Sequence, residues 1–180
     1  CLCDFVNDVA VADHTWLTRP HSRVAILDTM SQGVPHFPPN AGTSYCISGY
    51  LLLGYLIEKV TGRSYNENLQ TRICKKIGLK KTYVSATDKL KPREAASYTR
   101  DGNKWEKVND IYFPNVVGVG DILSTAGDLI TFDEALLNGK LITGNSLKMM
   151  IGDMDSTYGL GIMKIPFDDK MSLGDSGGTR

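Results

Sequence analysis

The amino-acid sequence predicts an α+β fold in which helices come first and strands come last. Residues 23–151 carry helix-like apolar patterns, separated by loops that are rich in proline and glycine. Residues 157–178 change to the alternating pattern of strands. Helices followed by strands are typical of an α+β arrangement, and 180 residues suit one domain that buries its own core.

The first predicted helices lie on either side of a loop. Arg23–Met30 is expected to form a short helix, and Ser31–Gly42 is expected to form an ordered loop because it is dense in proline and glycine. The segment GYLLLGYLIEKV at 49–60 is apolar over most of its helical surface, which predicts a buried helix. Gly62 stands where a C-terminal helix cap belongs.

Three more helices are predicted from their end signals. Ser64 and Glu67 have the spacing of a capping box, which begins a helix over 64–77. Ser124 is expected to cap a helix over 124–137, and a shorter helix is expected over 146–151.

Strand patterns are confined to two regions. Residues 158–167 (YGLGIMKIPF) and 170–174 (KMSLG) are predicted as two strands joined by a turn at Asp168-Asp169. Residues 84–117 are poorly patterned, so mostly loop is expected there, with a short hairpin around Asp101-Gly102. The prediction is thus a helical region plus one β-hairpin of an antiparallel sheet.

Composition and charge exclude several classes of protein. Apolar residues make up 42% and charged residues 22%, and 20 basic residues balance 20 acidic ones, so neither disorder nor nucleic-acid binding is expected. The densest basic group is interpreted as a solvated helix end: Lys75, Lys76, Lys80 and Lys81.

No apolar run is long enough to span a membrane. The four cysteines, Cys1, Cys3, Cys46 and Cys74, show no zinc spacing, and neither a metal nor a cofactor is expected.

Several motifs occur in the order found in one enzyme family. Residues 37–65 read FPPNAGTSYCISGYLLLGYLIEKVTGRSY, residues 77–82 read IGLKKT, and residues 120–129 read GDILSTAGDL. Residues 158–161 read YGLG, and residues 31–35 read SQGVP. In this order and spacing the chain resembles the β-lactamase and D-alanyl-D-alanine carboxypeptidase class of penicillin-recognising serine hydrolases, over about residues 23–178.

The resemblance implies a fold and a chemistry. The fold is an antiparallel sheet flanked by helices, with a helical subdomain inserted. The nucleophile is the serine of a Ser-x-x-Lys motif, because a serine hydroxyl attacks only after a neighbouring group takes its proton. Tyr45 matches the tyrosine of the Tyr-x-Asn motif and is the candidate catalytic residue, as a proton shuttle. The stretch Asp175-Ser176-Gly177 stands at the His-x-Gly wall of the substrate cleft.

The chain departs from the family pattern at three points. None of its twelve serines begins a Ser-x-x-Lys motif. Ile47 stands where the asparagine of Tyr-x-Asn contacts the substrate amide, and it offers no hydrogen bond. Asp175, in the substrate-binding wall with Ser176 and Gly177, adds a negative charge that repels a substrate carboxylate.

These departures, together with a first residue that is Cys1 rather than Met, predict an incomplete or processed domain over 1–180. Strands with missing neighbours would leave open sheet edges, so self-association is also expected.

A rival motif is present at the end of the sequence. Gly174-Asp175-Ser176-Gly177-Gly178 spells the nucleophile signature of trypsin-like proteases. That family needs a histidine base and a buried aspartate in an all-β domain, and the sequence around His14, His21 and His36 lacks its signature. The preferred interpretation is a changed His-x-Gly wall.

Two function classes therefore remain. A third interpretation is that the chain is a truncated or engineered piece. The first is a serine hydrolase that transfers the acyl group of a D-amino-acid amide, a β-lactam or a small ester, inactive or incomplete in this chain. The second is a non-catalytic module that binds a peptidoglycan-like peptide or a protein. The resemblance implies a periplasmic or extracellular location.

Overall fold

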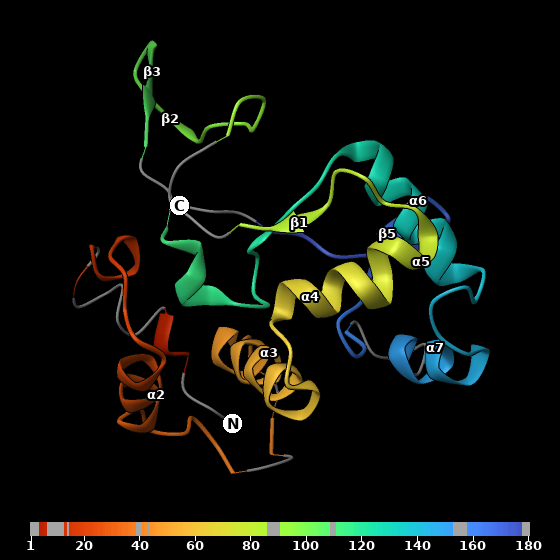
Figure 1. Cartoon of the computed structure of the whole chain (residues 1–180), viewed down its shortest axis with the longest axis horizontal. Helices are drawn as coiled ribbons and strands as arrows, with labels where there is room; N and C mark the ends of the chain where they lie inside the picture. Colours follow the sequence, from red (N-terminus) through yellow and green to blue (C-terminus); the bar gives the residue numbers. More distant parts are fainter. Residues whose placement is uncertain are drawn as a thin grey trace. The chain divides into compact units, whose positions relative to one another are not determined.

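The computed structural model describes residues 4–6, 13, 15–38, 41–42, 44–85, 91–108, 111–152 and 158–177 (Figure 1). Cys1, Cys3, His14 and Gly178, which carried sequence-based interpretations, lie outside these residues. The chain forms two compact units. The first is built mainly from Cys1–Asn68 and Tyr83–Leu123, and the second from Leu69–Thr82 and Ser124–Gly178. Among the described residues, none of the helices has the length and hydropathy needed to cross a membrane.

The first unit is centred on two helices, α2 (Arg23–Ser31) and α3 (Ile47–Thr61). The side chain of Ser22 caps α2 by accepting a hydrogen bond from the backbone N–H of Ala25. Gly62 ends α3 in the left-handed conformation, at φ 66°, as its place in the sequence predicted. Both helices are confirmed close to their expected bounds.

The core of the first unit forms where these helices meet the start of the chain. It is made of Phe5, Ile26, Leu51 and Tyr55, with Trp16 and Val117 among the residues packed against it. Gly54 of α3 lies against the backbone at Val117, and a Cβ atom at this position would be 2.7 Å from the Val117 carbonyl oxygen. This close approach explains a glycine inside a buried helix, where it otherwise costs stability.

Short strands and turns complete the first unit. Strand β1 (Tyr83–Val84) pairs antiparallel with β4 (Ile122–Leu123), a pairing that the sequence patterns did not predict. Strands β2 (Tyr98–Asp101) and β3 (Lys104–Lys107) form the hairpin that was expected at Asp101-Gly102. A 3₁₀ turn, η3, covers Phe113–Val116, and another, η1, covers Trp16–Thr18.

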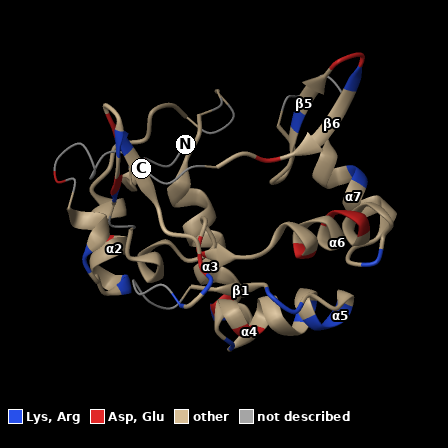
Figure 2. Ribbon diagram, turned by 90° about the horizontal axis from the view of Figure 1, so that it is seen from above, with Lys and Arg blue, Asp and Glu red and all other residues tan. Residues whose placement is uncertain are grey.

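The helix expected over 64–77 is present but is not regular. It consists of α4 (Tyr65–Leu69), a π-helical stretch η2 (Gln70–Cys74) and α5 (Lys75–Ile77). Its capping box is confirmed, because Ser64 N donates to Glu67 Oε2 at 2.8 Å and Glu67 N donates to Ser64 Oγ at 3.2 Å. Figure 2 shows α5 rich in basic residues, and the four lysines of the group identified in the sequence are all exposed.

The second unit holds α6 (Ala126–Leu137), α7 (Gly144–Ile151) and the hairpin of β5 (Met163–Phe167) and β6 (Lys170–Gly174). The prediction that Ser124 caps α6 is wrong. The cap is Thr125, whose hydroxyl accepts from Asp128 N at 3.3 Å, whereas Ser124 Oγ lies 2.8 Å from Thr82 Oγ1. The position next to the helix is the one whose side chain reaches its free N–H groups.

The first predicted strand of the second unit begins later than expected. Residues 159–161 turn instead of extending: Gly161 has φ 78°, and Leu160 N donates to the carbonyl oxygen of Met150 at 2.7 Å. Only Tyr158 keeps a bridge to Met163. The hairpin register, with Phe167 opposite Lys170 and Asp168-Asp169 in the turn, agrees with the prediction.

Candidate active site

Tyr45 lies directly before α3 and is exposed. Its side chain keeps 72% of its accessible surface, while Cys46 occupies the N-cap position of the helix. The start of this helix is anchored nearby, because the buried Ser48 Oγ accepts a hydrogen bond from Phe5 N at 3.0 Å. Tyr45 therefore lies directly before an anchored helix start, with most of its surface accessible.

Ile47 is the first residue of α3 and is half-buried. It is an apolar side chain at a helix start, where N–H groups are not paired within the helix. The structure thus brings Tyr45 and Ile47 together at one helix end.

Asp175, Ser176 and Gly177 follow β6 and are all exposed. Ser176 N donates to Asp175 Oδ1 at 2.8 Å, which is a local turn contact. A Cβ atom on Gly177 would meet nothing within 4 Å. These three residues belong to the second unit and Tyr45 and Ile47 to the first, so each group is described within its own unit.

Three hydroxyl groups in or beside the motifs that resemble the family have structural partners. Ser48 bonds to a backbone N–H, Ser64 bonds to the carboxylate of Glu67, and Ser124 bonds to the hydroxyl of Thr82. None of these three contacts provides an amine that could remove the hydroxyl proton, as nucleophilic catalysis requires. Groups of His, Cys, Asp and Glu able to hold a metal ion do not occur among the described residues.

A buried carboxyl that the sequence reasoning missed lies at Asp121. Its Oδ1 accepts from Gly118 N at 3.0 Å, while its buried Oδ2 has no hydrogen-bond partner in the described part of the chain. Burial, with a smaller contribution from the charge of Glu58, raises the pKa of Asp121 to about 6 against the lowering effect of the Gly118 N–H. The sequence around it, Gly120-Asp121, suggested only a turn.

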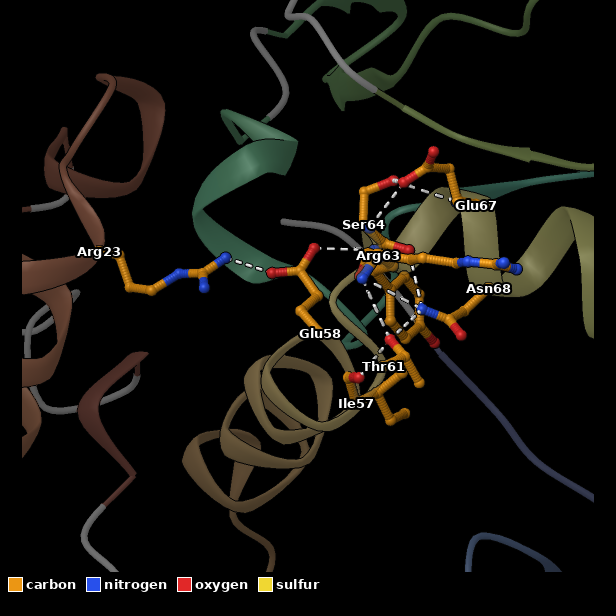
Figure 3. Close-up of polar contacts among 9 residues, drawn as sticks. Arg23, Ile57, Glu58, Thr61, Arg63, Ser64, Glu67 and Asn68 are labelled. Atoms are coloured by element: carbon orange, nitrogen blue, oxygen red, sulfur yellow. Dashed lines mark hydrogen bonds and ion pairs between the residues drawn. The ribbon is translucent and has the colours of Figure 1, made fainter.

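Glu58 joins three helices of the first unit (Figure 3). One of its carboxylate oxygens pairs with Arg23 of α2, and the other accepts from Tyr65 N, at the start of α4, at 2.7 Å. Arg23 also lies 4.2 Å from the centre of the Tyr55 ring. Where α3 meets α4, Asn68 Nδ2 donates to Thr61 Oγ1 at 2.8 Å, so side chains hold the corner between the two helices.

Comparison with known proteins identifies the family. The beta-lactamase family model matches residues 7–162. PbpX of Bacillus subtilis (strain 168), named as a penicillin-binding protein, is 32% identical over 142 residues, which cover 78% of this chain and 36% of that protein. "Penicillin-binding protein 4*" of the same organism is 31% identical over 128 residues, covering 63% and 28%.

The fold agrees with this match. The D-stereospecific amidohydrolase from Streptomyces sp. superposes with a TM-score of 0.80 at 26% sequence identity, covering 97% of this chain and 56% of that one. The chain thus spans about a third of the length of the two curated relatives and about half of the solved structure. The trypsin-like interpretation of Ser176 receives no support from these matches. The chain belongs to the β-lactamase family of serine hydrolases, with the α+β fold of that family.

Proposed function

We propose that the protein is a serine hydrolase that transfers the acyl group of a D-amino-acid amide, a β-lactam or a small ester, with Tyr45 as its proton shuttle. The observation that carries this proposal is the family match over residues 7–162. The role proposed for Tyr45 rests on its resemblance to the Tyr-x-Asn tyrosine and on its exposed position directly before α3. The relatives named as penicillin-binding proteins and as a D-stereospecific amidohydrolase support the same substrate class. The location that goes with it is periplasmic or extracellular.

The 180 residues by themselves are proposed to be inactive. They contain no Ser-x-x-Lys motif, so no serine has the paired lysine with which this family activates its nucleophile. The N–H groups that stabilise the oxyanion in such a site act on the charge that develops while a nucleophile attacks, so they do not replace a missing nucleophile. Substrate contacts are also altered, because Ile47 offers no hydrogen bond and Asp175 carries a negative charge.

The experiment is covalent labelling of the purified chain. We expect a fluorescent penicillin and an activated ester to leave the intact mass unchanged after long incubation. An added acyl mass on any serine, mapped by peptide digestion and lost in the corresponding Ser→Ala variant, would contradict the proposed inactivity.

Binding of a D-alanyl-D-alanine peptide tests the substrate class without requiring turnover. We expect Asp175→Asn to bind the peptide more tightly than the unaltered chain, by roughly threefold to tenfold, since it removes a charge that repels the peptide carboxylate. Asp169→Asn is the matched control, because it removes an equally exposed charge from the turn of the same hairpin. Equal effects of both substitutions would argue against a carboxylate site at Asp175.

The same departures favour a second candidate, a non-catalytic module that binds a peptidoglycan-like peptide or a partner protein. Ile47 and Asp175 both replace groups that the family uses on its substrate, while Tyr45 is kept. Saturable peptide binding without any covalent label would favour this module over the hydrolase.

A further inference from the structure

The β2–β3 hairpin carries an exposed aromatic and basic face that the proposed function does not use. Its register pairs Tyr98 with Lys107 and Arg100 with Trp105. Directly paired residues of an antiparallel ladder project to the same side, so these four residues share one face, called here the Tyr98–Trp105 face. Figure 1 shows the hairpin as a two-stranded arm of the first unit.

The two rings on this face are accessible and unsupported. Tyr98 and Trp105 keep 56% and 68% of their accessible surface, although rings of this size normally bury 150–250 Å² each, as an order of magnitude. In the described residues, neither ring has a hydrogen bond or a ring contact.

The charges of the hairpin are divided between its faces. Arg100 and Lys107 lie with the rings, whereas the opposite face carries Asp101, Lys104 and Glu106. Arg100 Nε donates to the carbonyl oxygen of Gly102 at 3.0 Å, so its guanidinium group is held beside the hairpin turn. No ion pair with Arg100 or Lys107 is formed in the described part of the chain. The ring-bearing face therefore has an excess of two positive charges.

We infer that the Tyr98–Trp105 face binds an anionic polysaccharide, a chain of sugar rings that bear carboxylate groups. A sugar ring has an apolar face that packs on an aromatic ring, and its carboxylate accepts hydrogen bonds from a guanidinium or ammonium group. In the register, each cross-strand row holds one aromatic and one basic residue, so a ring and a cation alternate across the face. A polymer of sugar rings that bear carboxylate groups offers a partner for both kinds of side chain.

A single-stranded nucleic acid also combines rings with negative charge, but the charge on this chain fits it less well. Nucleic-acid affinity comes mainly from neutralising many phosphates, and this face offers two cations on a chain with 20 basic and 20 acidic residues. The inference rests on the hairpin alone and does not depend on the proposed hydrolase activity.

The test is a titration of the whole chain with hyaluronan oligosaccharides, followed by tryptophan fluorescence and calorimetry. Neutral dextran and an oligo-dT strand of similar length are titrated in parallel. We expect saturable binding of hyaluronan with a blue shift from Trp105, weaker binding at high salt, and no binding of dextran.

Two matched lysine variants separate the faces. Lys107→Gln and Lys104→Gln remove the same charge from the same strand, one on the ring face and one opposite. We expect about a fivefold loss of affinity or more for Lys107→Gln and for Trp105→Ala, and less than about a twofold change for Lys104→Gln. Tighter binding of oligo-dT than of hyaluronan, equal losses in the two lysine variants, or absence of hyaluronan binding would each overturn the inference.

Discussion

A buried carboxyl group with one unpaired oxygen is the least expected residue of the first unit. Asp121 is held by the Gly118 N–H, and Tyr65 and Glu58 are the titratable groups that interact with it. The negative charge of Asp121 adds to burial in raising the pKa of Tyr65. A charge in such surroundings makes the fold depend on pH, because the folded state then binds the proton more tightly than the unfolded chain.

We predict that Asp121 lowers the stability of the protein as the pH rises from 4 to 7. Its pKa is raised from 3.8 to about 6 by folding, so between these values the folded state holds more protons and the free energy of unfolding falls with increasing pH. The stability contributed by protonation of Asp121 is fully present below the pKa of this group in the unfolded chain. It is lost as the pH rises through the pKa of about 6 in the folded protein. Asp121→Asn removes this dependence. The free energy of unfolding of the variant, relative to that of the unaltered chain, therefore increases by about 2 kcal/mol from pH 4 to pH 7.

Urea denaturation at pH 4, 5, 6 and 7 measures this difference. Asp101→Asn, which removes an exposed carboxylate at the end of strand β2, is the control and is expected to leave the slope almost unchanged. Parallel pH profiles for Asp121→Asn and the unaltered chain would show that the buried carboxyl does not titrate in this range.

Glu58 is the second residue whose role depends on tertiary structure. We predict that Glu58→Ala destabilises the protein by about 1–2 kcal/mol, because Tyr65 N loses a charge-assisted partner and Arg23 loses its ion pair. Glu58→Gln is expected to cost less than about 1 kcal/mol, since the amide oxygen still accepts from Tyr65 N and half-exposed ion pairs contribute little. Chemical denaturation measures both, and an effect of Glu58→Ala no larger than that of its exposed neighbour Lys59→Ala would exclude this role.

Helix positions and helix ends were predicted from the sequence, because they depend on interactions between residues close together in the chain. The apolar run and Gly62 predicted α3, and the capping box predicted the start of the next helix at Tyr65. The π-helical stretch Gln70–Cys74 was not predictable, because two of its side chains contact the backbone carbonyl of Thr82, which is distant in the sequence. Gln70 Nε2 donates to the Thr82 carbonyl oxygen at 2.8 Å, and Cys74 Sγ lies 3.7 Å from the same atom.

The β1–β4 pairing was missed for the same reason. Two strands of two residues each carry no alternation to detect, and their register depends on contacts across the unit. The late start of β5 likewise depends on the Met150 carbonyl oxygen, to which Leu160 N donates. Sequence patterns located these segments but could not give their geometry.

Helix α3 allows a matched test of the close contact at Gly54. We predict that Gly54→Ala destabilises the protein by about 1–3 kcal/mol, because the new methyl group would lie 2.7 Å from the Val117 carbonyl oxygen. Gly49→Ala, in the same helix, meets nothing within 4 Å and is expected to be neutral or to stabilise by up to about 1 kcal/mol.

Thermal unfolding followed by circular dichroism compares the two variants directly. If both alanines stabilise the chain, the approach of α3 to residue 117 is looser than the structure describes. The comparison emphasises packing, because both substitutions replace a glycine of the same helix with alanine.

For the whole molecule, the order of the motifs was sufficient to predict the family, and the matches confirmed it. The sequence predicted the candidate residues motif by motif, and the structure describes Tyr45 and Ile47 in the first unit and Asp175, Ser176 and Gly177 in the second. Motif identity follows from neighbouring residues, whereas the assembly of a cleft depends on how distant segments pack.

The two edges of the β5–β6 hairpin differ. The described residues contain no third strand that pairs with it. A two-residue turn joins Phe167 to Lys170, so these two residues form a hydrogen-bonded pair and every second pair after them does the same. Residues 166 and 173 belong to the pairs in between, and their backbone N–H and C=O positions therefore face away from the partner strand. Pro166 has no N–H and blocks the outer edge of β5, while the outer edge of β6 stays open beside the exposed Met171 and Leu173.

We therefore predict that the chain self-associates through the outer edge of β6. Sedimentation velocity between about 5 and 200 μM should show a concentration-dependent increase in mass. Leu173→Pro removes an outward N–H without breaking the bonds of the hairpin itself, so it should leave the chain monomeric. Leu173→Ala removes most of the apolar side chain but keeps the N–H, so it should still associate if strand pairing is the cause. Loss of association in both variants would instead identify apolar side-chain contacts as the interface, and a chain that stays monomeric throughout would show that this edge does not pair.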